Sequence, residues 1–503
     1  MKNKKKRKGF TLIELLAVII VLAIIALIAT PIIFNVIENA KLKSLENSCY
    51  GVIDGVRTKY AEGLLNSIDG TVKLKGNVTE ITVSGEQPIE GTWEIDNSRD
   101  SNNRGVKIKD VKFGSMKDYT CTNINSDGTI NSKVTCTKGG NNDEPTSEYT
   151  DNSGANKPEL FDNMVAIKYE NEKWLVANTS EKWYDYDAKE WANAVVLNSG
   201  VTKNVGDEVT EEEISLWYVW LPRYKYTIFN GNNGSAAAQL INVTFESGIS
   251  RTGTVTCTDN ADGSETCSTI TNGTSTYTHP AFKFGNTELT GFWAGKFEVS
   301  GSTSVITIKP NVTSLINTTV SGFFTVIQNV KTIYGINNAD SHMMKNMEWG
   351  AVAYLKQSKY GLGTTDIEVN TDLDHYYTGG GTGNAYKTNI SQSTTGNIYG
   401  VYVSGGAFEY VMGNYNDIIS SAGFSSMPAA KYYDKYTSRT GKIGDATTET
   451  SRWYGDGEHF PNSQYPWFVR GGSYTYGPAE GVFEAYDGDG IEYNSARAVL
   501  SAQ

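Results

Sequence analysis

The first 33 residues constrain this chain more than any other part of its sequence. Six of the first eight residues are Lys or Arg, and the segment 10–33, FTLIELLAVIIVLAIIALIATPII, is almost entirely apolar. A helix of about 20 apolar residues is long enough to cross the hydrocarbon core of a bilayer. A basic cluster before such a span holds the N-terminus in the cytoplasm. The sequence therefore predicts one membrane span over residues 10–33, with the rest of the chain outside the cytoplasm.

Two residues distinguish this segment from an ordinary secretory signal peptide or a plain membrane anchor. Gly9 lies where the charged and apolar segments meet, and Glu14 places a carboxylate inside the apolar segment. An ionisable group in a membrane span costs several kcal/mol unless it is paired. Cleavage after Gly9 would create a new amine at Phe10, and the same amine on a neighbouring copy of the chain would neutralise Glu14.

The segment KGFTLIELLAVIIVLAIIALIATP resembles the N-terminal signature of type IV pilins and pseudopilins. The resemblance implies that residues 1–9 are a leader, that a prepilin peptidase cuts between Gly9 and Phe10 and methylates the Phe10 amine, and that Glu14 serves assembly with other pilin subunits. Pro31 would kink the helix, because it lacks an N–H group. Apolar residues at helical spacing continue to about residue 65, so we expect a helix over residues 10–65 that leaves the cytoplasmic membrane as an amphipathic rod.

Residues 66–138 alternate between apolar and polar residues and predict a small antiparallel sheet. Cys121 and Cys136 face each other across a predicted hairpin, and Cys257 and Cys267 do so across a second one. Both pairs are expected to form disulfides outside the cytoplasm. Cys49 is left over, and a buried free thiol is favoured over a bridge between subunits.

The remainder of the chain predicts a linker and a second module. Residues 139–159 are polar and rich in Gly, Asn, Pro and Ser, as is typical of a linker. Within residues 160–503, four segments resemble, in order, the sulfatase-modifying factor (formylglycine-generating) family of C-type-lectin-like folds: GFWAGKFEVSG (291–301), GGAFEYVMG (405–413), RGGSY (470–474) and NSAR (494–497). We therefore expect an α+β chain with a long N-terminal helix, a small antiparallel sheet and a C-type-lectin-like module.

Catalysis is not expected. In the sulfatase-modifying family, copper-dependent oxidation depends on two cysteines near the C-terminal end of the fold, and this sequence has no Cys after Cys267. Cu(I) prefers thiolate ligands, so the oxidase site cannot be assembled. Glu409 and Glu484 would be candidates for a hydrolytic dyad. The acidic segments 487–490 and 259–263 would be candidates for Ca²⁺ binding, but both read more simply as turns. No cofactor or metal is expected, and a net charge of −12 disfavours nucleic acid as a partner.

The C-terminal segment predicts recognition of a surface ligand, either a glycan or a protein. Aromatic side chains give large contact areas at low entropic cost, and Asp or Asn adds adaptable hydrogen bonds. The ligand-binding candidates are Tyr474, Tyr476, Phe483, Tyr486, Asp487, Asp489, Tyr493 and Asn494. Arg470 and Arg497 are interpreted as structural clamps. The segment also resembles the variable region of proteins diversified by retroelements.

Together, these features favour a pilin-like surface subunit, minor or at the tip of a type IV pilus or related filament, that displays a lectin-like adhesion module. It would pass once through the membrane before assembly and then lie at the cell surface. Two alternatives are a surface enzyme of the sulfatase-modifying type on a pilin-like anchor and a pseudopilin of a secretion or DNA-uptake system.

Overall fold

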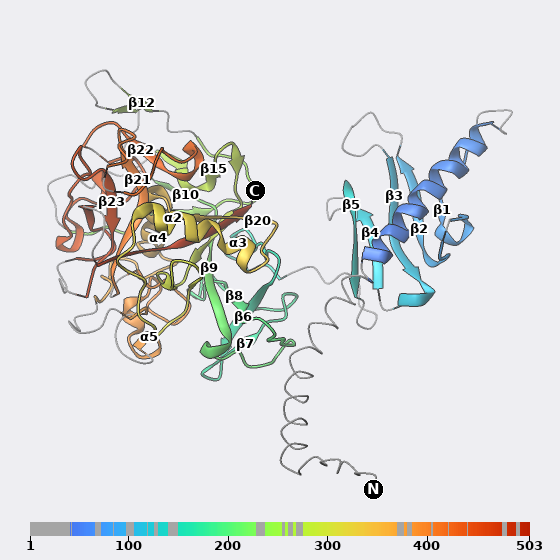
Figure 1. Ribbon diagram of the computed structural model, residues 1–503, viewed down its shortest axis with the longest axis horizontal. Helices are drawn as coiled ribbons and strands as arrows, with labels where there is room; N and C mark the ends of the chain where they lie inside the picture. The colour runs from blue at the N-terminus through green and yellow to red at the C-terminus, as the bar shows by residue number, and fades with distance from the viewer. Residues whose placement is uncertain are drawn as a thin grey trace, which may run out of the picture. The chain divides into compact units, whose positions relative to one another are not determined.

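The computed structural model describes residues 41–502 apart from residues 42, 84, 118, 421 and 440 and the segments 66–71, 97–104, 125–128, 139–148, 228–236, 254–256, 260–264, 268–274, 370–376, 380–384, 404–405, 475–479 and 489–492. Of residues 132, 137, 138, 257–259, 265–267 and 385 it describes the backbone alone. The chain divides into two compact units, unit 1 up to Thr146 and unit 2 from Ser147 onward. Figure 1 shows both units.

Unit 1 consists of a helix over residues 43–65 and an antiparallel sheet (Figure 1). The helix buries one face, formed by residues at helical spacing: Leu45, Cys49, Val52, Ile53 and Val56. The five strands follow each other in the order of the chain: β1 (Lys75–Asn77), β2 (Pro88–Asp96), β3 (Gly105–Phe113), β4 (Tyr119–Ile124) and β5 (Ile130–Lys138). The helical periodicity and the strand alternation of the sequence are thus both confirmed in the described part of unit 1.

The predicted hairpin around the first cysteine pair is confirmed. Strands β4 and β5 pair antiparallel with Cys121 directly opposite Cys136, and the two sulfur atoms form a disulfide. Cys49 is a buried free cysteine, as expected. The second pair is confirmed in backbone register alone, since β12 (Cys257–Asp259) and β13 (Glu265–Cys267) place Cys257 opposite Cys267.

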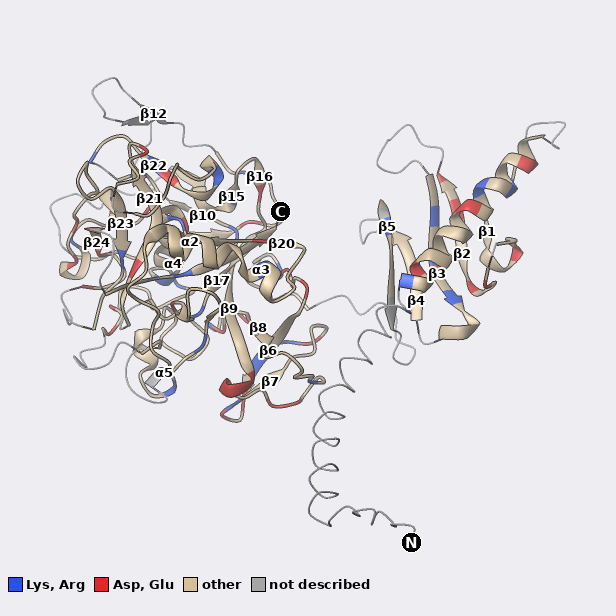
Figure 2. Cartoon of the chain, in the orientation of Figure 1, with Lys and Arg blue, Asp and Glu red and all other residues tan. Residues whose placement is uncertain are grey.

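Unit 2 is built on a seven-stranded antiparallel sheet. From one edge to the other, its strands are β20 (Ala339–Met343), β26 (Ala498–Ala502), β17 (Gly291–Gly295), β9 (Ile214–Pro222), β8 (Asn193–Leu197), β6 (Met164–Glu170) and β7 (Lys173–Val176). The strand nearest the C-terminus, β26, thus lies inside the sheet between β20 and β17. Every residue of β9 and β17 is buried, and neither strand carries a charged side chain (Figure 2). Such continuous apolar strands are typical of a sheet covered on both faces.

A second sheet holds the C-terminal region. Its path is β22 (Asp434–Tyr436), β21 (Phe408–Tyr415), β23 (Trp467–Arg470) and β24 (Ala485–Gly488), and β25 (Asn494–Ala496) pairs with β21. Strands β22 and β25 run parallel to β21. The α-helices in the described part of unit 2 are α2 (Val320–Gln328), α3 (Val330–Ile333), α4 (Asn346–Lys356) and α5 (Ala385–Thr388). All residues of α4 are buried.

Unit 2 also contains several short strands. A three-stranded sheet has the order β11 (Val243–Phe245), β10 (Tyr224–Thr227) and β14 (Thr276–Thr278). Two further pairs are β15 (Lys283–Phe284) with β16 (Thr287–Glu288) and β18 (Ser300–Gly301) with β19 (Ile306–Thr307). The described part of the chain is a mixed α+β structure, as predicted, and strands outnumber helices in it.

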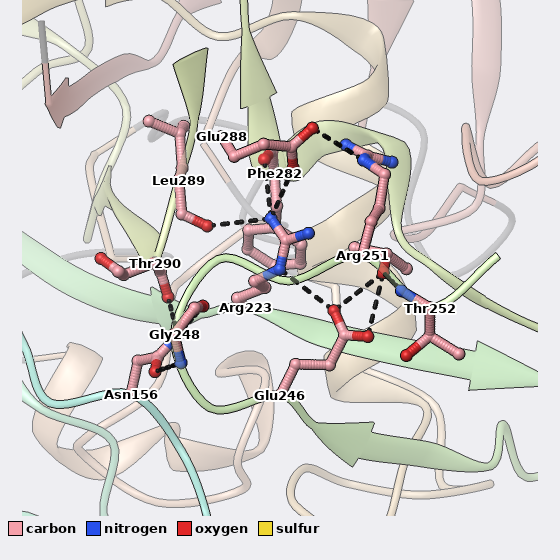
Figure 3. A network of polar contacts seen from close by, with 11 residues as sticks. Asn156, Arg223, Glu246, Gly248, Arg251, Thr252, Phe282, Glu288, Leu289 and Thr290 are labelled. Atoms are coloured by element: carbon pink, nitrogen blue, oxygen red, sulfur yellow. Dashed lines mark hydrogen bonds and ion pairs between the residues drawn. The ribbon is translucent and has the colours of Figure 1, made fainter. Parts of the chain in front are cut away.

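The predicted linker over residues 139–159 is too long, because its second half packs into unit 2. Asp151 is buried and accepts a hydrogen bond from the backbone N–H of Tyr186 at 2.7 Å. Asn156 donates from Nδ2 to the carbonyl of Thr290 at 2.8 Å and accepts from the N–H of Gly248 at 2.7 Å (Figure 3). Polarity of the sequence predicted a solvated linker here, but these polar side chains satisfy backbone groups of distant loops.

Beside Asn156, a buried arginine joins the loops at the end of β9. Arg223 donates from Nε to Glu246 at 3.1 Å and from Nη1 to Glu288 at 2.9 Å, and Glu288 also accepts from Arg251 at 2.8 Å (Figure 3). The same Nη1 reaches the carbonyls of Phe282 and Leu289. Two guanidinium groups against two carboxylates keep this network close to neutral, as burial of charge requires.

Candidate functional site

The predicted N-terminal site lies outside the described residues. This applies to Gly9, Phe10, Glu14 and Pro31 and to the expected span over residues 10–33. Among the helices that are described, from residue 41 onward, none is both long and apolar enough to cross a bilayer.

Two of the predicted ligand residues are exposed, and one of them lies in strand β24. Tyr486 and Tyr493 are exposed by 44% and 56%, and Asp487 is half-buried. Tyr476 and Asp489 lie outside the described residues. Tyr493 precedes β25, which pairs with β21 on the side opposite β23, so the strands β23 and β21 separate it from β24. We call the surface of β24 around Tyr486 and Asp487 the β24 face.

Three other predicted ligand residues are wrong as surface candidates, because Tyr474, Phe483 and Asn494 are buried with exposures of 8%, 3% and 8%. The ring of Phe483 packs edge-on against Trp453, with ring centroids 5.3 Å apart, and stacks on Tyr454 at 5.9 Å. The sequence could not separate these aromatics from exposed ones, since both kinds follow each other within one Gly-rich segment.

A neighbouring loop supports the β24 face. The backbone N–H of His459 donates to the carbonyl of Ala485 at 2.8 Å, and the His459 ring lies 5.0 Å from the ring of Tyr486. Asn462 donates from Nδ2 to Asp487 Oδ2 at 2.6 Å. These contacts hold the exposed tyrosine and the carboxylate in fixed positions, which lowers the entropic cost of binding a ligand.

Next to this face lies a carboxyl cluster formed by Asp456, Glu480 and Glu484, of which the sequence analysis named Glu484 alone. Asp456 accepts hydrogen bonds from the backbone N–H groups of Gly481 at 2.8 Å and Phe483 at 2.9 Å, and Glu484 accepts from the N–H of Gly457. Asp456 and Glu484 therefore each close a loop. The signal in the sequence was the pair Gly457 and Gly481. A Cβ at Gly481 would lie 3.0 Å from Asp456, so this close approach favours a glycine.

Two carboxyl groups of the cluster have pKa values raised to near neutral pH. Burial, together with the charges of Asp366 and Glu484, raises the pKa of Asp456 to about 7. Burial and the charges of Glu484 and Asp456 raise the pKa of Glu480 to about 8. Perturbed carboxyls of this kind gather at functional sites, although structural networks produce them as well. The arrangement can exchange protons beside the β24 face.

Arg497 and Arg470 are both fully buried, which agrees with their interpretation as structural clamps. Arg497 donates from Nε to Glu409 Oε2 at 2.8 Å and from Nη2 to Glu409 Oε1, and it also donates to the carbonyls of Gly295 and Tyr402, each at 2.7 Å. It thereby ties β17 of the first sheet to β21 of the second. Arg470 donates from Nη2 to the carbonyl of Ala446 at 2.8 Å.

The candidate hydrolytic dyad is not assembled as a unit, because its carboxylates belong to different networks. Glu409 is paired with Arg497, while Glu484 closes the loop at Gly457. A third titratable group, His342, is fully buried, with Nδ1 3.1 Å from Asp340 and Nε2 3.0 Å from Glu348. Both ring nitrogens are engaged, and the charges of these carboxylates raise its pKa against the opposing effect of burial. His342, Asp340 and Glu348 therefore form a buried network of charged groups.

In the part of the chain that the structure describes, one group of side chains has the geometry to hold a metal ion. It consists of Cys49, Cys121 and Cys136, whose sulfur atoms all lie within 4.8 Å of one another. Two of these sulfurs are already joined by the disulfide. The two predicted Ca²⁺ candidates lie largely among residues that are not described.

Comparison with known proteins bears directly on the N-terminus. Residues 4–30 match the prokaryotic N-terminal methylation motif. The chain carries a methylation motif. Gly9, Phe10 and Glu14 all fall within the matched residues, and the prediction made from the basic and apolar segments is confirmed at this level.

A curated relative agrees with the motif. Over 83 residues the chain is 30% identical to "Prepilin peptidase-dependent protein A" of Clostridium perfringens (strain 13 / Type A). The aligned part is 16% of this chain and 59% of that protein, so the chain spans less than two thirds of the relative.

Solved structures give a weaker comparison. Two solved structures, the M1 and I1 variants of the "Major Tropism Determinant", each align with 80% of this chain and 82% of their own chain at 15% identity. Their TM-scores are 0.26 and 0.25. Scores this low do not establish a shared fold.

Proposed function

We propose that this chain is a pilin-like subunit that is processed after Gly9, assembles into a surface filament and presents unit 2 as a ligand-binding module. The observation that carries the proposal is the methylation motif over residues 4–30. The β24 face supplies the candidate binding surface, because it combines the exposed Tyr486 with the fixed carboxylate of Asp487. The ligand is proposed to be a glycan or a protein at a cell surface.

Assembly would rest on Glu14. Its carboxylate lies in the apolar segment, where an unpaired charge is costly. The amine of Phe10 on a neighbouring subunit is proposed to neutralise it. Helix 43–65 would carry the buried contact with the sheet of unit 1, so that the sheet follows the helix into the filament.

The size of unit 2 favours a minor or tip subunit. Unit 2 extends from Ser147 to the last residue, and so holds more than two thirds of the chain. A module of this size on every subunit would crowd a closely packed filament. The C-type-lectin-like fold of unit 2 remains part of this proposal and rests on the sequence segments in β17, β21, β23 and β25.

Processing and assembly are tested together. In the producing bacterium, mass spectrometry of the mature chain should find Phe10 as a methylated N-terminus. The variant Glu14→Ala should insert in the membrane but be absent from sheared filaments. Glu62→Ala, which removes an exposed carboxylate from helix 43–65, is the matched control and should assemble normally. A mature chain that retains residues 1–9, or normal assembly of Glu14→Ala, would refute the proposal.

The binding face is tested separately with the full chain. Tyr486→Ala should reduce binding to a glycan array and to a panel of intact cells at least tenfold. Ile249→Ala removes another exposed apolar side chain, one with 54% exposure, and serves as the control. Equal binding by both variants would exclude the β24 face. Oxygen uptake with a Cys-containing peptide would instead support the enzyme alternative.

A further inference from the structure

Three sulfur atoms meet inside unit 1, although one disulfide uses two of them. Cys49 comes from helix 43–65, Cys121 from β4 and Cys136 from β5, and their sulfur atoms lie within 4.8 Å of one another. Cys121 and Cys136 are bonded, and Cys49 is free. The third sulfur is therefore a neighbour of the disulfide and not an isolated thiol in the core.

The surroundings close this site to other thiols. Cys49 and Cys121 are fully buried, and Cys136 is 9% exposed. Cys49 lies on the helix face that also buries Leu45 and Val52, and this face packs against the sheet in one apolar cluster. A thiol from solvent would have to displace that packing, whereas Cys49 is already in place.

We propose that Cys49 is an exchange partner of the Cys121–Cys136 disulfide, so that the chain can carry its bond either within the β4–β5 hairpin or between the helix and the sheet. In this step the Cys49 thiolate attacks the sulfur of Cys121 or Cys136. A new S–S bond forms, the old one breaks, and the released thiolate takes up the proton that Cys49 lost. The number of disulfides is unchanged, so no oxidant or reductant is required.

The distances allow this step with small movements. A disulfide requires its sulfurs to be about 2 Å apart. Sulfur atoms within 4.8 Å of one another can close most of that gap by rotation of side chains. The new bond would fasten the helix to β4 or β5 and close a much longer loop of chain than the hairpin bond does. By the chain-entropy argument, longer loops restrict the unfolded chain more strongly.

Exchange in the folded protein is slow at neutral pH. Burial, together with the charge of Glu46, raises the pKa of the Cys49 thiol to about 12. Since the thiolate is the attacking form, about one molecule in 10,000 is reactive at pH 8. The rate should therefore rise about tenfold for each pH unit below 12.

The first test uses single substitutions in the full chain, in a background where Cys257 and Cys267 are both Ser. In Cys121→Ser, we expect a disulfide between Cys49 and Cys136 under glutathione redox buffer. In Cys136→Ser, we expect one between Cys49 and Cys121. Peptide mapping without reduction reports both bonds, and far-UV circular dichroism verifies folding. Cys49→Ser is the control and should retain the hairpin bond with no free thiol. Two free thiols in both folded single variants would overturn the proposal.

The second test needs no substitution at the three sulfurs and decides the matter where the variants fail to fold. The protein is held between pH 7 and pH 10, acid-quenched and alkylated, and the labelled cysteine is identified by mass spectrometry. We expect the label to move from Cys49 to Cys121 or Cys136, faster at higher pH and independent of protein concentration. A label confined to Cys49 at every pH, or a rate proportional to concentration, would contradict exchange within one chain.

Discussion

Removal of Arg497 should destabilise unit 2 severely. This side chain is fully buried and holds Glu409 through two N–H groups, while two of its other N–H groups donate to the carbonyls of Gly295 and Tyr402. The two glutamate oxygens and both carbonyls would lose their donor in Arg497→Met. Breaking a buried ion pair by removing one partner costs about 3–5 kcal/mol.

A second carboxyl nearby limits how the site can adapt. Burial and the charge of Glu409 raise the pKa of Glu298 to about 8, so Glu298 is mostly protonated at pH 7. Without Arg497, Glu409 must also take up a proton. The variant should therefore lose less stability at pH 5 than at pH 8. Arg497→Met combined with Glu409→Gln should recover part of the loss, because no unpaired charge is then left in the core.

Tryptophan fluorescence during urea denaturation isolates this effect. Of the ten tryptophans, Trp93 alone lies in unit 1, so the signal reports almost entirely on unit 2. Arg439→Met changes an exposed arginine of the same unit and is the matched control, with an expected change near zero. If Arg497→Met lowers the free energy of unfolding by less than about 1 kcal/mol, as the loss of an exposed ion pair would, this arginine does not join the two sheets in the way we describe.

Two further outcomes are expected from the same urea denaturation measurement. Burial raises the pKa of Glu449 from 4.5 to about 7, so between these pH values the folded chain keeps a proton that the unfolded chain has lost. The contribution of Glu449 to the stability of the fold is therefore complete below pH 4.5 and is lost as the pH rises through 7. Between pH 4.5 and pH 8 the free energy of unfolding should therefore fall by about 3 kcal/mol more in the wild type than in Glu449→Gln. Parallel profiles of unfolding free energy against pH for the two proteins would contradict this. Gly350→Ala should destabilise unit 2 by about 1–3 kcal/mol, because a Cβ there would lie 1.9 Å from the carbonyl oxygen of Gly444. A gain in stability, as helix propensity alone would give, would show that α4 can move away from this loop.

The sequence by itself determined the features that are encoded locally. The basic and apolar segments, with Gly9 before Phe10, were enough to predict the processing motif, and residues 4–30 match it. Helical periodicity predicted helix 43–65, and the paired cysteines predicted the hairpin with Cys121 opposite Cys136. Each of these signals depends on spacing along a short stretch, which one sequence displays in full.

Tertiary structure alone decided which side chains are accessible and which distant residues meet. Phe483 and Tyr486 are three residues apart and both aromatic, yet one is 3% and the other 44% exposed. The carboxyl cluster joins Asp456 to Glu480 and Glu484 through loops that have no common pattern. Cys49 meets the disulfide because a helix face packs on the sheet. Burial and proximity depend on packing between segments that are far apart in the chain, and this information is absent from local periodicity.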